Sequence, residues 1–154
     1  MGGDLPLEID VKIPTGLTYK QPTGLFINNE FTYPKQKRTF EVISPVNEEV
    51  VASVYEALEE DVDVAVDAAI AAYQTWSTSA PELRSSVLYK VADLVEKNAD
   101  TLAQIETLDN GKSISNAKGD VQLVANYFRS CAGWCDKILG SVINTAVSYT
   151  HLRA

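Results

Sequence analysis

Two cysteines and one histidine are the residues in this sequence whose side chains could act as a nucleophile or a metal ligand. Cys131 and Cys135 are four residues apart. That spacing puts both on one face of a helix and matches neither a CxxC redox centre nor a zinc site. His151 is the single histidine, so no Cys/His metal cluster or Ser-His-Asp triad can be assembled from well-placed residues. We interpret the cysteines as packing residues and expect no catalytic residue in this chain.

The polar stretch ETLDNGKSISNAKGDV, residues 106–121, is the other candidate for chemistry. It alternates acids with lysines and contains Asn110-Gly111 between two segments of apolar periodicity. Two interpretations stay open. The stretch is either a capped turn between helices, closed by Asp109 and Asn110 with Lys112 solvated, or part of a ligand site.

Composition limits the classes of function. The chain has 154 residues, of which 45% are apolar and 22% charged, which is typical of one globular domain. Its net charge of −8 argues against nucleic acid and anionic membranes as partners, because both attract basic surfaces. No apolar run approaches the roughly 20 residues that span a bilayer. The N-terminal segment lacks the pattern of a signal or transit peptide, which predicts a cytoplasmic location.

The elements that must position these residues change in type along the chain. Residues 1–24 are rich in proline and glycine, which predicts an extended arm. The segment LFINNEFTY alternates apolar residues around Asn28-Asn29 and predicts a hairpin. TFEVISP and VVASVYEA follow as β-rich runs. We therefore expect three or four short antiparallel strands.

Four helices are expected after the strands. The first opens with three acids at residues 59–61, and the second has Pro81 in its first turn, with Ser79 and Glu82 spaced as a capping box. The third ends at Asn110-Gly111, and the fourth runs from about residue 115 to 138. The residues of the fourth helix expected to be buried are Val121, Val124, Phe128 and Trp134.

This order gives an α+β chain, with short antiparallel strands followed by about four helices. The strands are too short to cover the apolar stripes of four helices. We therefore expect that something else lies beneath those helices.

Four segments resemble a known family in order and spacing. LTYKQPTGLFINNEF, EEDVDVAVDAAIAAY, IETLDNGKS and SCAGWCDKILGSVINT resemble the N-terminal part of NAD(P)-dependent aldehyde dehydrogenases, in particular the fungal acetaldehyde-oxidising group. The resemblance covers about residues 17–145. It implies an α/β fold in which residues 25–145 form the N-terminal part of the NAD-binding domain, and it accounts for the uncovered helices.

The resemblance also implies an activity. Family members oxidise aldehydes to carboxylic acids with NAD or NADP, through a cysteine thiohemiacetal and thioester. The nucleophile, the general base and most of the cofactor site lie in parts that are not among these residues. We therefore expect no cofactor-binding residue here, no tight cofactor binding and no activity of this chain alone. An aldehyde substrate and homo-oligomerisation are the partners that the resemblance implies for the whole protein.

Five site residues carry over from the resemblance. A monovalent cation is expected at Asp109 and at the main-chain carbonyls of Val42 and Ile43, a donor set that suits a hard cation. Leu123 and Gly119 are expected to line the substrate tunnel, and the alternative for Leu123 is an ordinary core position. Because glycine within a helix costs about 1 kcal/mol relative to alanine, Gly119 suggests that a neighbour or ligand needs the room.

Residues 146–154, AVSYTHLRA, match nothing in the family and resemble a translated sequencing adapter. We expect them to be an assembly artefact. The alternative is a genuine truncated product that docks onto full-length subunits as a non-catalytic module. Neither the choice between NAD and NADP, nor the aldehyde, nor a dimer or tetramer is specified by these residues.

Overall fold

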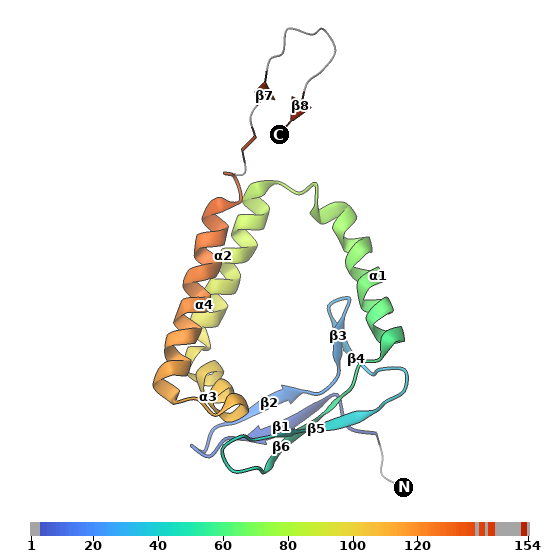
Figure 1. The fold of residues 1–154 in the computed structure, drawn as a ribbon, viewed down its shortest axis with the longest axis vertical. Helices are drawn as coiled ribbons and strands as arrows, with labels where there is room; N and C mark the ends of the chain where they lie inside the picture. Colours follow the sequence, from blue (N-terminus) through green and yellow to red (C-terminus); the bar gives the residue numbers. More distant parts are fainter. Residues whose placement is uncertain (1–3, 138, 141, 144–151, 154) are drawn as a thin grey trace.

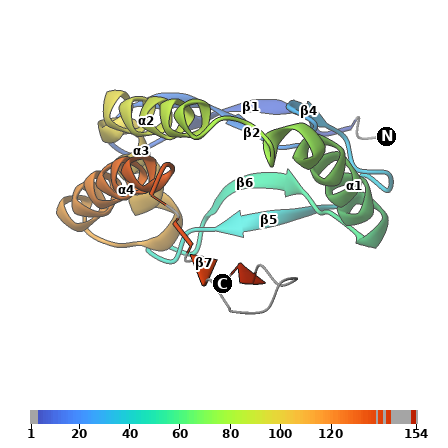
Figure 2. The ribbon, with the colours of Figure 1, turned by 90° about the horizontal axis from the view of Figure 1, so that it is seen from above.

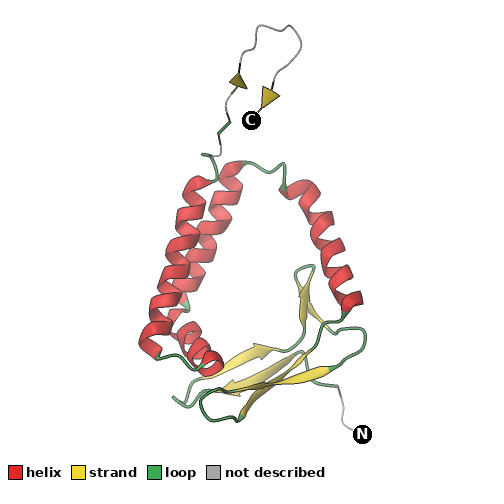
Figure 3. Ribbon diagram, in the orientation of Figure 1, coloured by secondary structure: helices red, strands yellow, loops and turns green. Residues whose placement is uncertain are grey.

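The computed structural model of the chain describes residues 4–137, 139–140, 142–143 and 152–153. The strands that precede the helices gather at one end of the molecule and the longer helices rise from them, whereas the two short strands near the C-terminus lie beyond the opposite end of the helices (Figures 1 and 3). This segregation is the α+β arrangement that the sequence predicts. The strands are β1 (Glu8–Lys12), β2 (Thr18–Pro22), β3 (Leu25–Ile27), β4 (Glu30–Thr32), β5 (Thr39–Ile43), β6 (Val50–Tyr55), β7 (Val142–Ile143) and β8 (Leu152–Arg153).

Each strand pairs with its neighbour in sequence, in antiparallel two-stranded sheets. The expected hairpin at Asn28-Asn29 is confirmed. Both asparagines have positive φ, 50° and 68°, as a tight primed turn requires. The expected arm instead contains the β1–β2 hairpin, in which Val11 is buried. The period-two alternation of apolar residues outweighs the nearby prolines there.

Backbone and side-chain hydrogen bonds join the hairpins at Tyr55, the last residue of β6. Its N–H donates to the Thr23 carbonyl at 2.9 Å, and its hydroxyl donates to the Leu5 carbonyl at 2.6 Å. The Thr23 N–H in turn donates to the Leu7 carbonyl at 3.0 Å. Tyr55 and Thr23 are both buried. The pKa of the Tyr55 phenol is accordingly raised, chiefly by burial.

The four expected helices are all present. They are α1 (Glu59–Trp76), α2 (Pro81–Lys97), α3 (Ala99–Asn110) and α4 (Ile114–Trp134). Helices α2 and α4 run side by side, with α3 at the foot of the pair next to the strands (Figures 1 and 2). Ala92 of α2 and Ala125 and Ala132 of α4 are among the buried residues of this pair, and their small side chains allow the two helices to approach closely. None of the described helices is both long and apolar enough to cross a membrane.

Helix α1 stands apart from the other helices and touches the β3 strand near its base (Figure 1). Asp61 anchors it, because the carboxylate accepts hydrogen bonds from the N–H groups of Leu58 and Lys35, each at 3.0 Å. These two bonds lower the pKa of Asp61, and the bond from the Leu58 N–H has the larger effect. Asp61 is the buried residue of this helix, whereas Ile70 is 55% and Tyr73 62% exposed. The apolar stripe of α1 therefore lacks a partner among the described residues.

The structure corrects several local expectations. Val121 is buried and Phe128 half-buried, but Val124 is 44% and Trp134 64% exposed, because no layer of described residues lies on that face of α4. The capping box at Ser79 was wrong. Ala80 occupies the N-cap position of α2, and the Ser79 hydroxyl donates to the Trp76 carbonyl at the end of α1. Pro81 begins α2 as expected. The fourth helix ends at Trp134, short of the expected end at about residue 138, because residues 135–137 are not helical.

An ion cluster centred on Arg129 joins α4 to α2. The guanidinium of Arg129 bonds both carboxylate oxygens of Glu96, one of them through Nη2 at 2.8 Å, and it bonds Asp93 at 2.9 Å. Gln122 donates to the same Glu96 carboxylate at 3.3 Å. Arg129 first, and Gln122 second, lower the Glu96 pKa from 4.5 to about 2. This fork-shaped pairing holds the two helices in register.

The cluster predicts a pH dependence of stability. Since the Glu96 pKa is lower in the folded chain, its contribution is fully present above about pH 4.5 and is lost as the pH falls through about 2. We expect the unfolding midpoint of Glu96→Gln to fall less steeply than that of the wild type across this window, by circular dichroism. Glu41→Gln is the control, because Glu41 is exposed and pairs with no described cation. Parallel pH profiles for the wild type and Glu96→Gln would contradict the assignment.

Candidate functional site

The junction between α3 and α4 is formed by residues of the polar stretch 106–121. Helix α3 ends at Gly111, which has a φ of 77° and donates its N–H to the Thr107 carbonyl at 3.0 Å. Glycine is the residue that adopts this left-handed conformation without steric cost. A Cβ at Gly111 would also lie 3.0 Å from Cγ of Pro45. The close approach joins the helix junction to the loop that follows β5.

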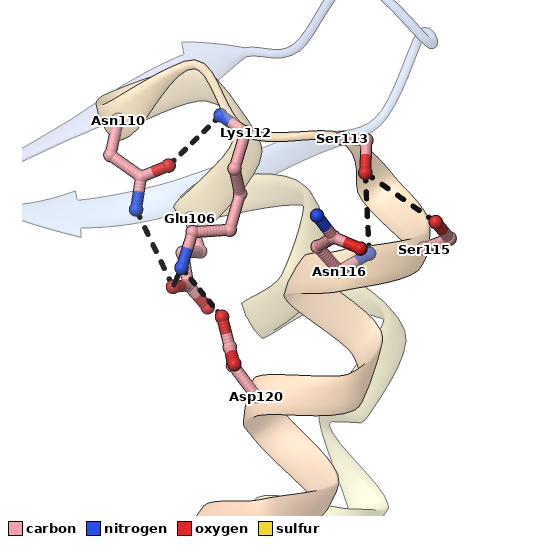
Figure 4. Close-up of polar contacts among 7 residues, drawn as sticks. All are labelled: Glu106, Asn110, Lys112, Ser113, Ser115, Asn116 and Asp120. Carbon is pink, nitrogen blue, oxygen red and sulfur yellow. Dashed lines mark hydrogen bonds and ion pairs between the residues drawn. The ribbon is translucent and has the colours of Figure 1, made fainter.

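The start of α4 is capped within the same stretch. The Ser113 hydroxyl accepts from the Asn116 N–H at 3.4 Å, and Asn110 Oδ1 accepts from the Lys112 N–H at 3.0 Å (Figure 4). The first bond satisfies an N–H that the start of α4 leaves free, and the second closes the turn at Lys112. The expected turn is therefore present, but Asn110 and Gly111 close it rather than the predicted Asp109 and Asn110.

Lys112 is half-buried and pairs with two carboxylates rather than lying free in solvent, so that part of the turn interpretation was wrong. Its ammonium lies 2.5 Å from Glu106 Oε1 on α3 and 2.5 Å from Asp120 Oδ2 on α4 (Figure 4). The side chains of Lys112 and Glu106 are about one-third exposed. Asp120 first, and Glu106 second, raise the pKa of Lys112. One cation thus bridges the carboxylates of two helices across the turn.

A hollow of about 650 Å³ opens beside this cluster. Its walls come from the strands and from α2, α3 and α4, and they are mostly apolar. Tyr19, Val42, Leu102, Ile105, Val121 and Val124 are among them, with the carboxylates of Glu106, Asp109 and Asp120 at the same site. Burial, and then the negative charge of Asp109, raise the pKa of the Tyr19 phenol. The hollow is an apolar recess with an acidic side.

Two of the three expected cation ligands lie at this hollow. Asp109 and Val42 both line it, although they are far apart in the sequence. Ile43 is 47% exposed and is not among the residues that line the hollow. The pairing of β5 with β6 is irregular between Val42 and Ile43, which interrupts the regular hydrogen bonding of the strand there. A carboxylate with main-chain carbonyls has the chemistry of a monovalent-cation site.

The remaining site candidates lie on exposed surfaces. Gly119 lines a second hollow, of about 410 Å³, with Lys112, Ser115, Asn116 and Asp120. Leu123 is 66% exposed, one turn further along α4. A Cβ at Gly119 would meet nothing within 4 Å. The room that Gly119 leaves is therefore open in the described part of the chain, and the expected place of Leu123 and Gly119 in a tunnel stays a prediction.

The two cysteines are free thiols and half-buried. The Cys135 thiol, at the C-cap of α4, donates to the Cys131 carbonyl at 3.5 Å. Among the described residues, no group of three or more His, Cys, Asp or Glu side chains is placed to hold a metal ion. His151 lies outside the described residues.

Sequence reasoning missed the Lys112 and Arg129 clusters. Glu106 and Asp120 are six and eight residues from Lys112, and Glu96 is 33 residues from Arg129. None of these separations is the i,i+4 spacing that identifies a pair within one helix. The signal that was available is the excess of acids and lysines around the helix junction.

The junction predicts opposite effects for two glycines. Gly111→Ala should destabilise the chain by about 1–2 kcal/mol, because alanine is strained at positive φ and its Cβ would press on Pro45. Gly119→Ala, the matched control in α4, should stabilise it by about 0.5–1 kcal/mol. Chemical denaturation followed by circular dichroism measures both. Equal effects of the two substitutions would contradict the geometry described for Gly111.

Comparison with known proteins identifies relatives along most of the chain. A family model described as "Aldehyde dehydrogenase family" matches residues 31–154. This range includes residues 146–154, and the expectation that they are an assembly artefact stays a prediction. An aldehyde dehydrogenase of Davidiella tassiana is 49% identical over 138 residues, which are 89% of this chain and 28% of that protein. An aldehyde dehydrogenase of Alternaria alternata is 51% identical over 148 residues, which are 93% of this chain and 30% of that protein.

Solved structures agree with the sequence comparison. An aldehyde dehydrogenase from Bacillus cereus aligns with a TM-score of 0.78 and 40% identity, covering 82% of this chain and 26% of that one. A betaine aldehyde dehydrogenase from Staphylococcus aureus, solved in complex with NAD+, aligns with a TM-score of 0.78 and 31% identity over the same shares. The chain thus spans under a third of the length of the relatives that it matches.

Proposed function

Because this chain belongs to the aldehyde dehydrogenase family, we propose that it forms the N-terminal part of an enzyme that oxidises aldehydes to carboxylic acids with NAD or NADP as hydride acceptor. The match of residues 31–154 to the family carries the proposal. An NAD+ complex of one structural relative supports the choice of cofactor class. The uncovered apolar stripes of α1 and α4 support the view that this chain works as one layer of a larger domain.

We propose that the described residues shape the substrate passage and that none of them acts as nucleophile or base. None of the helices described starts after a glycine-rich turn, so these residues do not fit the pyrophosphate of a dinucleotide. Neither Cys131 nor Cys135 is held by a described base. We therefore propose that the chain alone is inactive, and that the junction and α4 shape one side of the substrate passage through Leu123 and Gly119.

A second function rests on the same exposed faces. A chain with uncovered apolar helices could act as a non-catalytic module that docks onto full-length subunits. Co-purification of this chain with an intact subunit would favour that function. The family match supports the enzyme more directly, because it covers residues 31–154, which include both strands and helices.

Activity and the passage are tested together in the complete protein that the gene encodes. It should reduce NAD or NADP in the presence of an aldehyde, followed by cofactor absorbance, whereas the 154-residue chain should not. Gly119→Leu should raise the KM for a bulky aromatic aldehyde by about tenfold, because the side chain fills the room that glycine leaves. The kcat for a small aldehyde should stay within about twofold of that of the wild type. Removal of a catalytic group lowers kcat by far more than this.

Gly133→Leu is the matched control for the passage. Gly133 lies on the same helix, and its Cβ would also meet nothing within 4 Å. Its KM for the bulky aldehyde should be that of the wild type. Turnover by the short chain would contradict the proposed inactivity, and equal KM values for the two leucine variants would contradict the role of Gly119.

The cation site is tested by stability rather than by activity. We propose that Asp109 and the carbonyls of Val42 and Ile43 hold a monovalent cation, supported by the shared hollow of Asp109 and Val42. K+ or Na+ at ten times the dissociation constant should raise the unfolding midpoint by about 3–6 °C over choline chloride of equal ionic strength. Asp109→Asn should abolish the rise, while Asp67→Asn, at an exposed residue of α1, should keep it. A rise that survives in Asp109→Asn would exclude this site.

A further inference from the structure

The pair Asn110-Gly111 lies exposed at the end of α3, next to the Lys112 cluster. An asparagine followed by glycine is the pair most open to internal attack, because glycine has no Cβ to shield its backbone nitrogen. We propose that Asn110 is a site of spontaneous deamidation, and that the Glu106–Lys112–Asp120 cluster sets the rate by holding the last turn of α3 closed.

The chemistry needs water and base alone. The Gly111 backbone nitrogen loses its proton to solvent hydroxide and attacks Cγ of Asn110. A C–N bond forms, the Cγ–Nδ2 bond breaks, and the amide nitrogen takes a proton from water and leaves as ammonia. Water then opens the succinimide at either carbonyl and yields aspartate or isoaspartate. No atom is oxidised or reduced.

The closed junction opposes the first step. The Gly111 N–H is bound to the Thr107 carbonyl at 3.0 Å, so the attacking nitrogen is engaged. The Asn110 amide is held at both ends (Figure 4). Its oxygen accepts from the Lys112 N–H at 3.0 Å and its nitrogen donates to Glu106 Oε1 at 3.4 Å. Attack therefore requires the last turn of α3 to open.

The Lys112 cluster resists that opening. Glu106 belongs to the last turns of α3, and Lys112 joins it to Asp120 on α4 with two contacts of 2.5 Å. When the turn opens, the ammonium must release at least one of its carboxylates. Removal of one carboxylate should therefore favour the open form and speed the reaction at Asn110.

The fold itself retains the reactive pair. Gly111 cannot gain a side chain without strain, because of its positive φ and the 3.0 Å approach of Pro45. Deamidation would place a new carboxylate beside Glu106 and remove the amide donor to it. The isoaspartate product would also lengthen the backbone where Gly111 meets Pro45. The modification would thus loosen the junction that holds α3, α4 and the β5–β6 loop together.

Peptide mapping of the whole chain tests the proposal. Trypsin releases residues 98–112, which contain Asn110, after incubation at a fixed, mildly alkaline pH. Mass spectrometry should show that the acid form of Asn110 accumulates more slowly in the folded chain than in the free synthetic peptide. Asp120→Asn, which leaves this peptide unchanged, should raise the rate constant about two- to fivefold, as the loss of a modest ion pair predicts.

Two variants complete the test. Asp93→Asn removes a carboxylate from the separate Arg129 cluster and should leave the rate at Asn110 as in the wild type. Asn110→Gln should remove the acid form and so assign it to this residue. The proposal is overturned if Asn110 stays an amide in the wild-type chain, or if Asp120→Asn reacts no faster than Asp93→Asn.

Discussion

The left-handed turn at Gly111 is the constraint on which the helix junction depends. Its φ of 77° reverses the chain between α3 and α4, and its missing side chain lets the Pro45 ring approach. Three parts of the molecule meet there, namely the end of α3, the start of α4 and the loop between β5 and β6. The Lys112 cluster and the hollow with Asp109 and Val42 are both consequences of this meeting. A different angle between α3 and α4 would move Glu106 and Asp120 away from Lys112.

The second constraint is that the apolar stripes of this chain exceed what its own elements can cover. The pair α2–α4 buries alanines, but large apolar residues on α1 and α4 remain exposed. Such surfaces are typical of a layer that packs on a further layer. The relatives are more than three times as long as the part of them that aligns with this chain, which is consistent with such a layer. The exposed apolar faces of α1 and α4 thus support the proposal that this chain functions as one layer of a larger domain.

Much of the fold was predictable from local patterns. The turn at Asn28-Asn29, the start of α1 at three acids, Pro81 at the start of α2 and Gly111 after α3 follow from residues whose backbone or charge preferences act over a few positions. The first hairpin was not expected because the prolines and glycines of residues 1–24 favoured an extended arm, whereas the alternation that buries Val11 decides the structure. The Ser79 cap was misplaced because the serine hydroxyl could bond either the preceding or the following helix.

The sequence by itself determined the order and type of the elements and the family to which they belong, because both depend on residue spacing along the chain. The tertiary structure decided which side chains meet. It brought Asp109 of α3 to the same hollow as Val42 of β5, placed Lys112 between two carboxylates, and left Leu123 exposed. Those outcomes depend on how the helices cross and on which faces find a partner. No local spacing encodes them, since the contacts join residues that lie on different elements.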